Sequence, residues 1–301
     1  SWHSVATKSN FNSDLPRVPW LMLPEEEDDD GNSSYRKFFS LYNGMILKKR
    51  IPKASRKRCM ESRGWLITVE KNKGEVSLLH PFSGVVIELP HRNTTVEEDN
   101  GIMRRNFFEK AVLSASPSHT SDYVLVVIDR GCLNFWRPGD LSWTSCLDYT
   151  AISAAVHVDV VYFNGHFYAV DALGRIILYD VAQPQPTRRS HIVTQIRDFA
   201  QQFYILESLG SLFVVLRHRV DVINFNLADR SPERTYGTRE FRVYQIDLAA
   251  GKATRTRELG DRAFFLGYNA SISVQACQFP GIKPNHIYYT DDLNESFQAF
   301  N

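Results

Sequence analysis

A meander of short apolar runs separated by glycine-containing turns recurs along this chain and constrains its fold more than any other feature. The clearest copy spans residues 64–90, GWLITVEKNKGEVSLLHPFSGVVIELP. Its apolar runs are Trp65–Val69, Val76–Leu79 and Val85–Leu89, and each turn between them contains a glycine. Short runs of β-branched and aromatic residues between glycine turns predict antiparallel strands.

The same pattern returns further along the chain. The other copies lie at Tyr123–Leu147, Asp159–Asp180, Leu206–Leu248 and Ala263–Asp291. A strand meander repeated roughly every 40 to 60 residues is typical of a β-propeller, in which each copy forms one blade. With about twenty strands in view, we predict an all-β propeller of four-stranded antiparallel blades, six in number within a range of five to seven.

Composition argues against several classes of protein. The 301 residues are 43% hydrophobic and carry a formal net charge of +1, so no global field favours nucleic acid or membrane as a partner. The longest uninterrupted apolar run, Tyr123–Ile128, is far shorter than a membrane span. The four cysteines have no metal-ligand spacing, which favours reduced, mostly buried thiols in an intracellular protein.

The N-terminal segment differs from the repeats. Residues 1–8, SWHSVATK, predict the end of a helical region. Residues 9–35 hold prolines around Trp20 and then six consecutive acids, Glu25–Asp30, which predict an extended, acidic linker. We therefore expect a helical tail over 1–8, a linker over 9–35 and the propeller over 36–301.

A basic stretch follows the linker. Lys48–Arg58 contains seven basic residues in eleven positions. One interpretation is a nuclear-import patch or an anion site. The other, which we favour, is a solvated strand edge and loop, because lysines commonly guard exposed edges.

Few titratable side chains are candidates for metal binding or catalysis. His157, Asp159 and His166 are the candidate metal ligands, since the first two share a strand face at a spacing of two. No further acids or thiols converge on them, and no GxSxG, Walker or GxGxxG motif is present. We therefore expect no metal, no cofactor and no catalytic residue.

Aromatic residues have a structural and a functional interpretation. Trp136 and Trp143 either stack on a ligand or pack between blades, and packing is the simpler role. Trp65, Ile67 and Val69 alternate along one strand, so we expect all three to pack between blades.

Two polar segments are the candidates for substrate binding, because long loops on a rigid scaffold often carry binding residues. Pro184–Arg189 and Asp229–Arg239 both carry several arginines, which suit acidic or phosphorylated partners. A merely solvated loop is the alternative for each. The predicted substrate-binding residues are Arg188, Arg189, Arg230, Arg234 and Arg239.

The order of several motifs resembles that of one known family. These motifs are GWL…SLLHPFSG…ELP, KAVLSASP, RPGD..W, VVYFNGHFYAVD..GRI and FPGIKPNHIYYTDD. From about Arg36 to Asp292 they resemble plant F-box proteins with a KIB-type β-propeller. Ser1–Lys8 is similar to the tail of the F-box itself, with His3 where arginine is usual.

The resemblance implies a function and two partners. It implies a non-catalytic substrate-recognition subunit of a Skp–cullin–F-box E3 ubiquitin ligase, active in the nucleus and cytoplasm. A Skp-type adaptor would bind the missing upstream F-box, and the propeller would hold a protein substrate for ubiquitination. Substrate identity does not follow from the resemblance.

A second interpretation comes from a different class of protein. It is a propeller hydrolase or a carbohydrate-binding, lectin-like module, which would need convergent polar residues on the innermost strands. We expect valine, leucine, phenylalanine and isoleucine to dominate those strands, which favours the recognition module.

Overall fold

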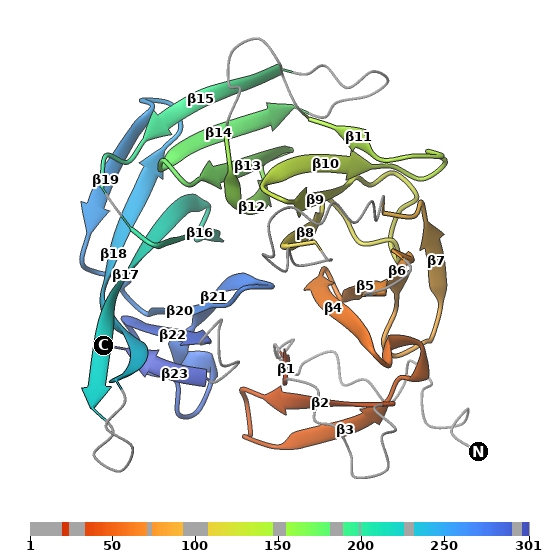
Figure 1. Ribbon diagram of the computed structural model, residues 1–301, viewed down its shortest axis with the longest axis horizontal. Coiled ribbons are helices and arrows are strands. Elements are labelled where there is room, and N and C mark those ends of the chain that lie inside the picture. The colour runs from red at the N-terminus through yellow and green to blue at the C-terminus, as the bar shows by residue number, and fades with distance from the viewer. Residues whose placement is uncertain are drawn as a thin grey trace.

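Six sheets arranged around a common axis form the molecule (Figure 1). The computed structural model describes residues 20–23, 34–70, 74–92, 108–146, 155–180, 189–198, 200–225, 232–290 and 297–300. The predicted all-β propeller and its six blades are confirmed. Within the described ranges there is no α-helix, and so no helix that could cross a membrane.

The first three blades follow the chain in order, each with its own sheet. Blade 1 contains β1 (Trp20–Met22), β2 (Tyr35–Ser40) and β3 (Ile46–Arg50). Blade 2 contains β4 (Lys57–Ser62), β5 (Trp65–Glu70), β6 (Val76–Leu79) and β7 (Val86–Leu89). Blade 3 contains β8 (Lys110–Leu113), β9 (Leu125–Asp129), β10 (Cys132–Trp136) and β11 (Thr144–Ser145).

The remaining blades continue around the ring, with four described strands each. Blade 4 contains β12 (His157–Phe163), β13 (His166–Asp171), β14 (Arg175–Asp180) and β15 (Arg189–Gln195). Blade 5 contains β16 (Gln202–Ser208), β17 (Ser211–Phe225), β18 (Pro232–Asp247) and β19 (Lys252–Thr256). Blade 6 contains β20 (Arg262–Leu266), β21 (Ser271–Gln275), β22 (His286–Thr290) and β23 (Phe297–Phe300).

The repeat seen in the sequence is offset from the blade. Residues 64–90 supply β5, β6 and β7, whereas the innermost strand β4 lies upstream and begins with the last two residues of the basic stretch. The strongly apolar runs Tyr123–Ile128 and Leu212–Leu216 contribute to β9 and β17, which are second strands and not the strands nearest the axis. Second strands are covered on both faces by neighbouring blades, which explains why they are apolar throughout.

Packing between blades follows the period of two along each strand. Trp65, Ile67 and Val69 are buried in one cluster with residues of blade 3, among them Leu113 and Leu125. The Trp65 indole also donates a hydrogen bond across the interface, from Nε1 to Ser118 Oγ at 3.0 Å. The predicted packing of these three side chains between blades is therefore confirmed.

Blade 1 begins earlier than the predicted boundary. β1 pairs with β2 in antiparallel register, Trp20 opposite Ser40, so part of the expected 9–35 linker is a blade strand. The sequence did not predict this strand, because it is only three residues long and lies among prolines. The expected helical tail over 1–8 lies outside the described residues.

Adjacent residues of β2 join blade 1 to both of its neighbours. Phe38 packs with Leu66 and Leu79 of blade 2. Phe39 packs instead in a cluster with Phe265 and Tyr288 of blade 6. Blades 1 and 6 thus meet through side chains, and no described sheet contains strands from both.

Blade 6 departs from the strand order of blades 2–5. Its order is β21-β20-β22-β23, and β20 pairs with β22 in parallel, Ala263 opposite His286. The chain between them passes through β21 and the 3-10 turn η4 (Ala276–Gln278). A parallel pair needs such a crossover connection, because a tight hairpin cannot join parallel strands.

Candidate protein-binding surface

The longest hairpin of the propeller is formed by β17 and β18, of 15 and 16 residues (Figure 1). Asp229–Arg239 was expected to be a polar loop, and this expectation is wrong for Pro232–Arg239, which lies in β18. The ladder continues out to Phe225 opposite Pro232. Backbone pairing holds this part of the hairpin, although the sequence of Pro232–Arg239 lacks an apolar alternation.

A β-bulge marks the base of the extended part. His218 lies opposite Glu240 and Arg219 lies opposite Thr238, so Arg239 is the extra residue. Bulges bend a strand pair, strengthen its twist and re-aim a side chain. Arg239, one of the predicted binding residues, is exposed at this bend.

Arg217 fastens the base of the hairpin to blade 6. Its side chain is buried, and its Nε donates to Thr238 Oγ1 at 2.9 Å. The guanidinium carbon lies 4.5 Å from the Tyr289 ring centroid, and Nη1 donates to Thr290 O at 3.4 Å. Phe241 packs edge-on against the same Tyr289 ring at 5.2 Å. These contacts fix where the hairpin leaves the ring.

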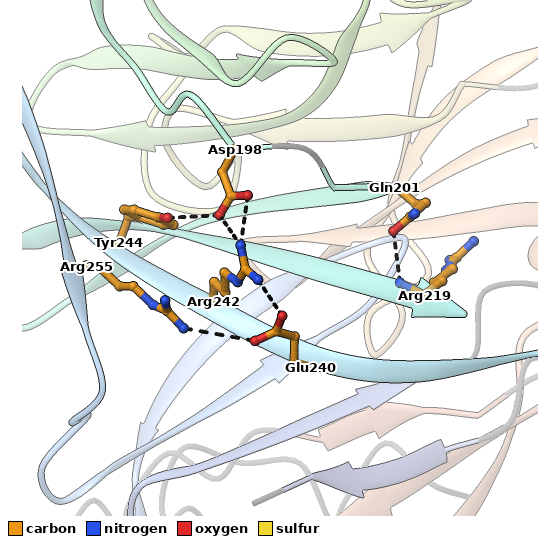
Figure 2. Close-up of polar contacts among 7 residues, drawn as sticks. All are labelled: Asp198, Gln201, Arg219, Glu240, Arg242, Tyr244 and Arg255. Atoms are coloured by element: carbon orange, nitrogen blue, oxygen red, sulfur yellow. Dashed lines mark hydrogen bonds and ion pairs between the residues drawn. The ribbon is translucent and has the colours of Figure 1, made fainter. Parts of the chain in front are cut away.

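A charged network lies at the same end of blade 5, against the connection from blade 4 (Figure 2). Arg242 Nη1 donates to both carboxylate oxygens of Asp198 at 2.9 Å, and Nη2 donates to Glu240 Oε1 at 2.6 Å. Tyr244 OH donates to Asp198 Oδ2 at 3.0 Å. Arg255 lies 4.0 Å from Glu240. Arg242 is therefore the centre of the network.

Hydrogen bonding sets the protonation states in this network. Burial would raise the pKa of Asp198, but hydrogen bonds from Arg242 and Tyr244 outweigh it and hold that pKa below its usual value. The hydrogen bond from Arg242 likewise lowers the pKa of Glu240, while Glu240 and Asp198 raise the pKa of Arg242. Burial, and then the bond to Asp198, raises the pKa of Tyr244. At neutral pH the network thus holds two carboxylates, a guanidinium and a neutral phenol.

A second contact links the blade 4–5 connection to the bulge. The Arg219 amide donates to Gln201 Oε1 at 2.9 Å (Figure 2). The Arg219 guanidinium also donates to Gln202 Oε1. The residues that lead into β16 therefore support the hairpin on one side, and Arg217 supports it on the other.

The structure describes only part of the predicted set of five binding arginines. Arg188 and Arg230 lie outside the described residues, and of Arg189 and Arg234 only the strand positions, in β15 and β18, are described. The four strands of blade 4 are successively antiparallel, so β15 ends on the face of the ring where β12 begins. The chain then enters blade 5, and β16 begins on that same face. β17, antiparallel to β16, ends on that face, whereas β14 ends and β15 begins on the opposite one. Arg189 and the hairpin therefore belong to opposite faces.

The residues missed from the sequence are those of the charged network. Glu240, Arg242 and Tyr244 alternate with Phe241 and Val243 along β18. The apolar pair packs toward blade 6, which leaves the polar set on the side of blade 4. This period of two was a usable signal, but Asp198 lies 44 residues from Arg242, and only the fold brings them together.

The innermost strands are more polar than expected. They carry Lys110 and Asp159, whose side chains form a buried ion pair at 2.7 Å, and Arg58, which donates to Asn269 Oδ1 at 3.1 Å. The expectation of apolar innermost strands is therefore wrong. Asp159 Oδ2 also accepts from the Ile205 amide at 3.0 Å. The Lys110–Asp159 pair joins neighbouring blades 3 and 4, whereas Arg58 and Asn269 join blades 2 and 6, which flank blade 1.

The candidate metal ligands also bond to protein groups. His157 Nδ1 lies 2.8 Å from Gly131 O and Nε2 lies 2.7 Å from Tyr179 OH. Since a carbonyl can only accept, Nδ1 carries the proton and Nε2 accepts from the phenol. His166 Nδ1 faces Asn164 O at 3.0 Å. Over the described ranges no three His, Cys, Asp or Glu side chains are placed to hold a metal ion.

The remaining aromatic and sulfur candidates have structural environments. Trp136 is buried and donates from Nε1 to Asp140 O at 3.0 Å. Trp143 donates to Pro90 O at 2.9 Å and packs edge-on against Phe108, which supports the packing role for both. All four cysteines are free thiols, but Cys59 alone is fully buried and Cys277 is exposed.

Comparison with known proteins agrees with this architecture. The chain matches the KIB1-4 beta-propeller family over residues 38–301. It is 25% identical over 248 residues to the putative F-box protein At1g65770 of Arabidopsis thaliana, covering 77% of this chain and 66% of that protein. It is 28% identical over 238 residues to the putative F-box protein At5g55150 of the same plant, with coverage of 77% and 62%.

A third relative has a related name. The F-box/kelch-repeat protein At3g18720 of Arabidopsis thaliana is 23% identical over 222 residues, covering 67% of this chain and 54% of the relative. The chain spans less than two thirds of the length of these three proteins. Because the family match covers nearly all six blades, the chain belongs to the KIB1-4 beta-propeller family.

Proposed function

We propose that this chain is the substrate-recognition part of a Skp–cullin–F-box E3 ubiquitin ligase, in which the propeller holds a protein substrate for ubiquitination. The observation that carries the proposal is the membership of the KIB1-4 beta-propeller family together with relatives named F-box proteins. The propeller supplies no catalytic group in this proposal. In support, the polar side chains described on the innermost strands, such as Lys110 and Asp159, bond to protein partners.

The adaptor and the substrate bind different parts of the protein in this proposal. A Skp-type adaptor binds an F-box upstream of the propeller, since an interface of ordinary size buries about 800 Å² per partner. Residues 1–8 are too few to supply such an interface. The complex works in the nucleus and the cytoplasm.

The substrate binds the face on which the β17–β18 hairpin emerges. The hairpin is anchored at its base by Arg217 and by the Asp198–Arg242 network, so it presents Arg239 from a fixed position. Exposed arginine favours acidic or phosphorylated groups, because its guanidinium forms paired, charge-assisted hydrogen bonds with them. The alternative, a hydrolase or lectin-like module, gains no support from the described residues.

The test compares this chain with the same chain extended upstream through a complete F-box. Both are immobilised and exposed to plant extract, and the retained proteins are identified by mass spectrometry. The Skp-type adaptor should be retained only by the extended chain, whereas a substrate should be retained by both. Equal retention of the adaptor, or a substrate that never binds the propeller alone, would refute the proposal.

Two matched charge reversals locate the substrate face. Arg239→Glu changes the hairpin, whereas Lys252→Glu changes an exposed residue at the start of β19, on the opposite face. Only the first change should weaken retention of substrate. Equal weakening by both would argue against a site on the hairpin face.

A further inference from the structure

Blades 1 and 2, neighbours on the side of the ring across from β17–β18 (Figure 1), both carry exposed apolar side chains. Leu47 of β3 is 40% exposed, and Phe82 and Val85 of the β6–β7 turn are 59% and 52% exposed. Lys49 Nζ lies 5.2 Å from the Phe82 ring centroid, and Lys53 joins the same turn. We call these five residues the rim patch.

The turn that carries Phe82 is rigid. Two backbone hydrogen bonds of 2.9 Å close it, from His80 N to Val85 O and from Gly84 N to His80 O. Gly84 adopts a φ of +74°, and Ser83 N donates to His80 Nδ1 at 3.1 Å. Lys53 Nζ donates to Gly84 O at 3.3 Å. The backbone that carries Phe82 is therefore held in place before any partner binds, which lowers the entropic cost of using this residue as an anchor.

The part of the chain that forms blade 1 and leads into blade 2 is basic, although β7 of blade 2 carries the exposed Glu88. Between Ser34 and Met60 the sequence has nine lysines and arginines and no aspartate or glutamate, although the whole chain has a net charge of only +1. Protection of the β3 edge would account for the lysines. It does not account for Phe82, Val85 and Leu47, because edge protection requires charge and not exposed apolar surface. Exposed apolar clusters rimmed by polar groups mark interaction sites.

We propose that the rim patch binds an extended acidic segment of a partner protein. An apolar side chain of the segment packs on Phe82 and Val85, and its carboxylates face Lys49 and Lys53. β3, which carries Leu47 and Lys49, is the outermost described strand of its sheet. This second surface does not depend on the proposed ligase function, and its failure would leave that function untouched.

The experiment measures binding of defined peptides by fluorescence anisotropy. The probe is a fluorescein-labelled peptide of five Glu-Leu repeats, and the control is the matching Lys-Leu peptide. The acidic peptide should bind the chain, with an affinity that falls as salt is raised, since exposed charges are screened. The Lys-Leu peptide should bind at least tenfold more weakly.

Variants identify the surface. Phe82→Ser and Lys49→Glu should each weaken binding of the Glu-Leu peptide about tenfold, a change of about 1.4 kcal/mol. The matched controls, Leu141→Ser, at a side chain 96% exposed, and Lys252→Glu, should leave affinity unchanged. Thermal denaturation verifies that each variant is folded.

Three results would overturn the proposal. The first is equal affinity for the acidic and basic peptides, or equal affinity of the parent and the Phe82→Ser variant. The second is binding that appears only after Glu25–Asp30 are replaced by serine and asparagine, which would assign the patch to the chain's own acidic segment. The third is binding to phosphatidylserine vesicles or to single-stranded DNA but not to the Glu-Leu peptide.

Discussion

Lys110 of blade 3 and Asp159 of blade 4 form a buried ion pair in which Nζ lies 2.7 Å from Oδ1. The other carboxylate oxygen accepts from the Ile205 amide of blade 5 at 3.0 Å. One carboxylate therefore joins the innermost strands of three successive blades. Asp159 also accepts from the Val160 amide at 2.8 Å, so it is well supplied with donors.

Removing the lysine alone should be costly. Lys110→Met leaves Asp159 buried without its counter-charge, and we expect a loss of about 3–5 kcal/mol in the free energy of unfolding. The double variant Lys110→Met/Asp159→Asn should regain part of this loss, because no buried charge remains. Urea denaturation measures both. A loss below about 1 kcal/mol in the single variant would show that the pair is solvated.

Trp65 tests the packing between blades 2 and 3. It is 4% exposed and its indole bonds to Ser118, so Trp65→Ala should lower the free energy of unfolding by about 3–5 kcal/mol. Leu141→Ala, at a side chain that is 96% exposed, should change it by less than about 0.5 kcal/mol. Equal stability of the two variants, measured by thermal denaturation, would contradict the packing described above.

Gly174 and Gly165 form a matched pair of turn glycines. Both have positive φ, +71° and +85°, so alanine is strained at either position. A Cβ at Gly174 would lie 2.5 Å from Ile196 O, whereas a Cβ at Gly165 has nothing within 4 Å. Gly174→Ala should therefore be the more destabilising variant, by about 1–3 kcal/mol. Similar melting temperatures for the two variants would show that the blade 4–5 connection, which contains Ile196, moves easily enough to accommodate the added methyl group.

Because of His157, we expect the free energy of unfolding to decrease at mildly acidic pH. Its pKa is lowered mainly by burial, so below the unfolded value of about 6.5 the unfolded chain binds the proton more readily. Stability is complete above that pH and falls as the pH drops toward the lower folded pKa. His157→Gln should flatten the dependence between about pH 7 and 5. Tyr179→Phe keeps the imidazole and should keep a dependence. If the free energy of unfolding of His157→Gln depends on pH as steeply as that of the parent, other groups cause the dependence.

The sequence predicted the repeated parts of the fold best. Asn164-Gly165 and the turn Pro81–Gly84 were located correctly, because turn residues and a period of two are local signals. β1 was predicted to be linker, since three residues among prolines carry no period. The parallel pairing of β20 with β22 was not predicted, because it depends on a crossover and not on local pattern.

The candidate surface was harder to predict than the blades. Arg239 was predicted from its charge and is exposed at the bulge. The supports beneath it join Arg217 and Arg242 of blade 5 to Thr290 of blade 6 and to Asp198 in the blade 4–5 connection. Spacing in the sequence does not tell which distant residues will lie within hydrogen-bond distance of each other. These contacts could therefore be identified only from the folded structure.

The junction between blades 1 and 6 has a mechanical consequence. Phe39 and Leu21 meet Phe265 and Tyr288 there through side chains, and the chain does not pass directly from one blade to the other as it does at the other junctions, so the ring resembles a split washer. Tension across this junction would load apolar contacts, which yield gradually. A sheet shared between the ends would instead resist through a ladder of hydrogen bonds sheared together. All other neighbouring blades are linked directly by the chain as well as by side chains, so a pulling experiment should separate blades 1 and 6 at a lower force than any other neighbouring pair.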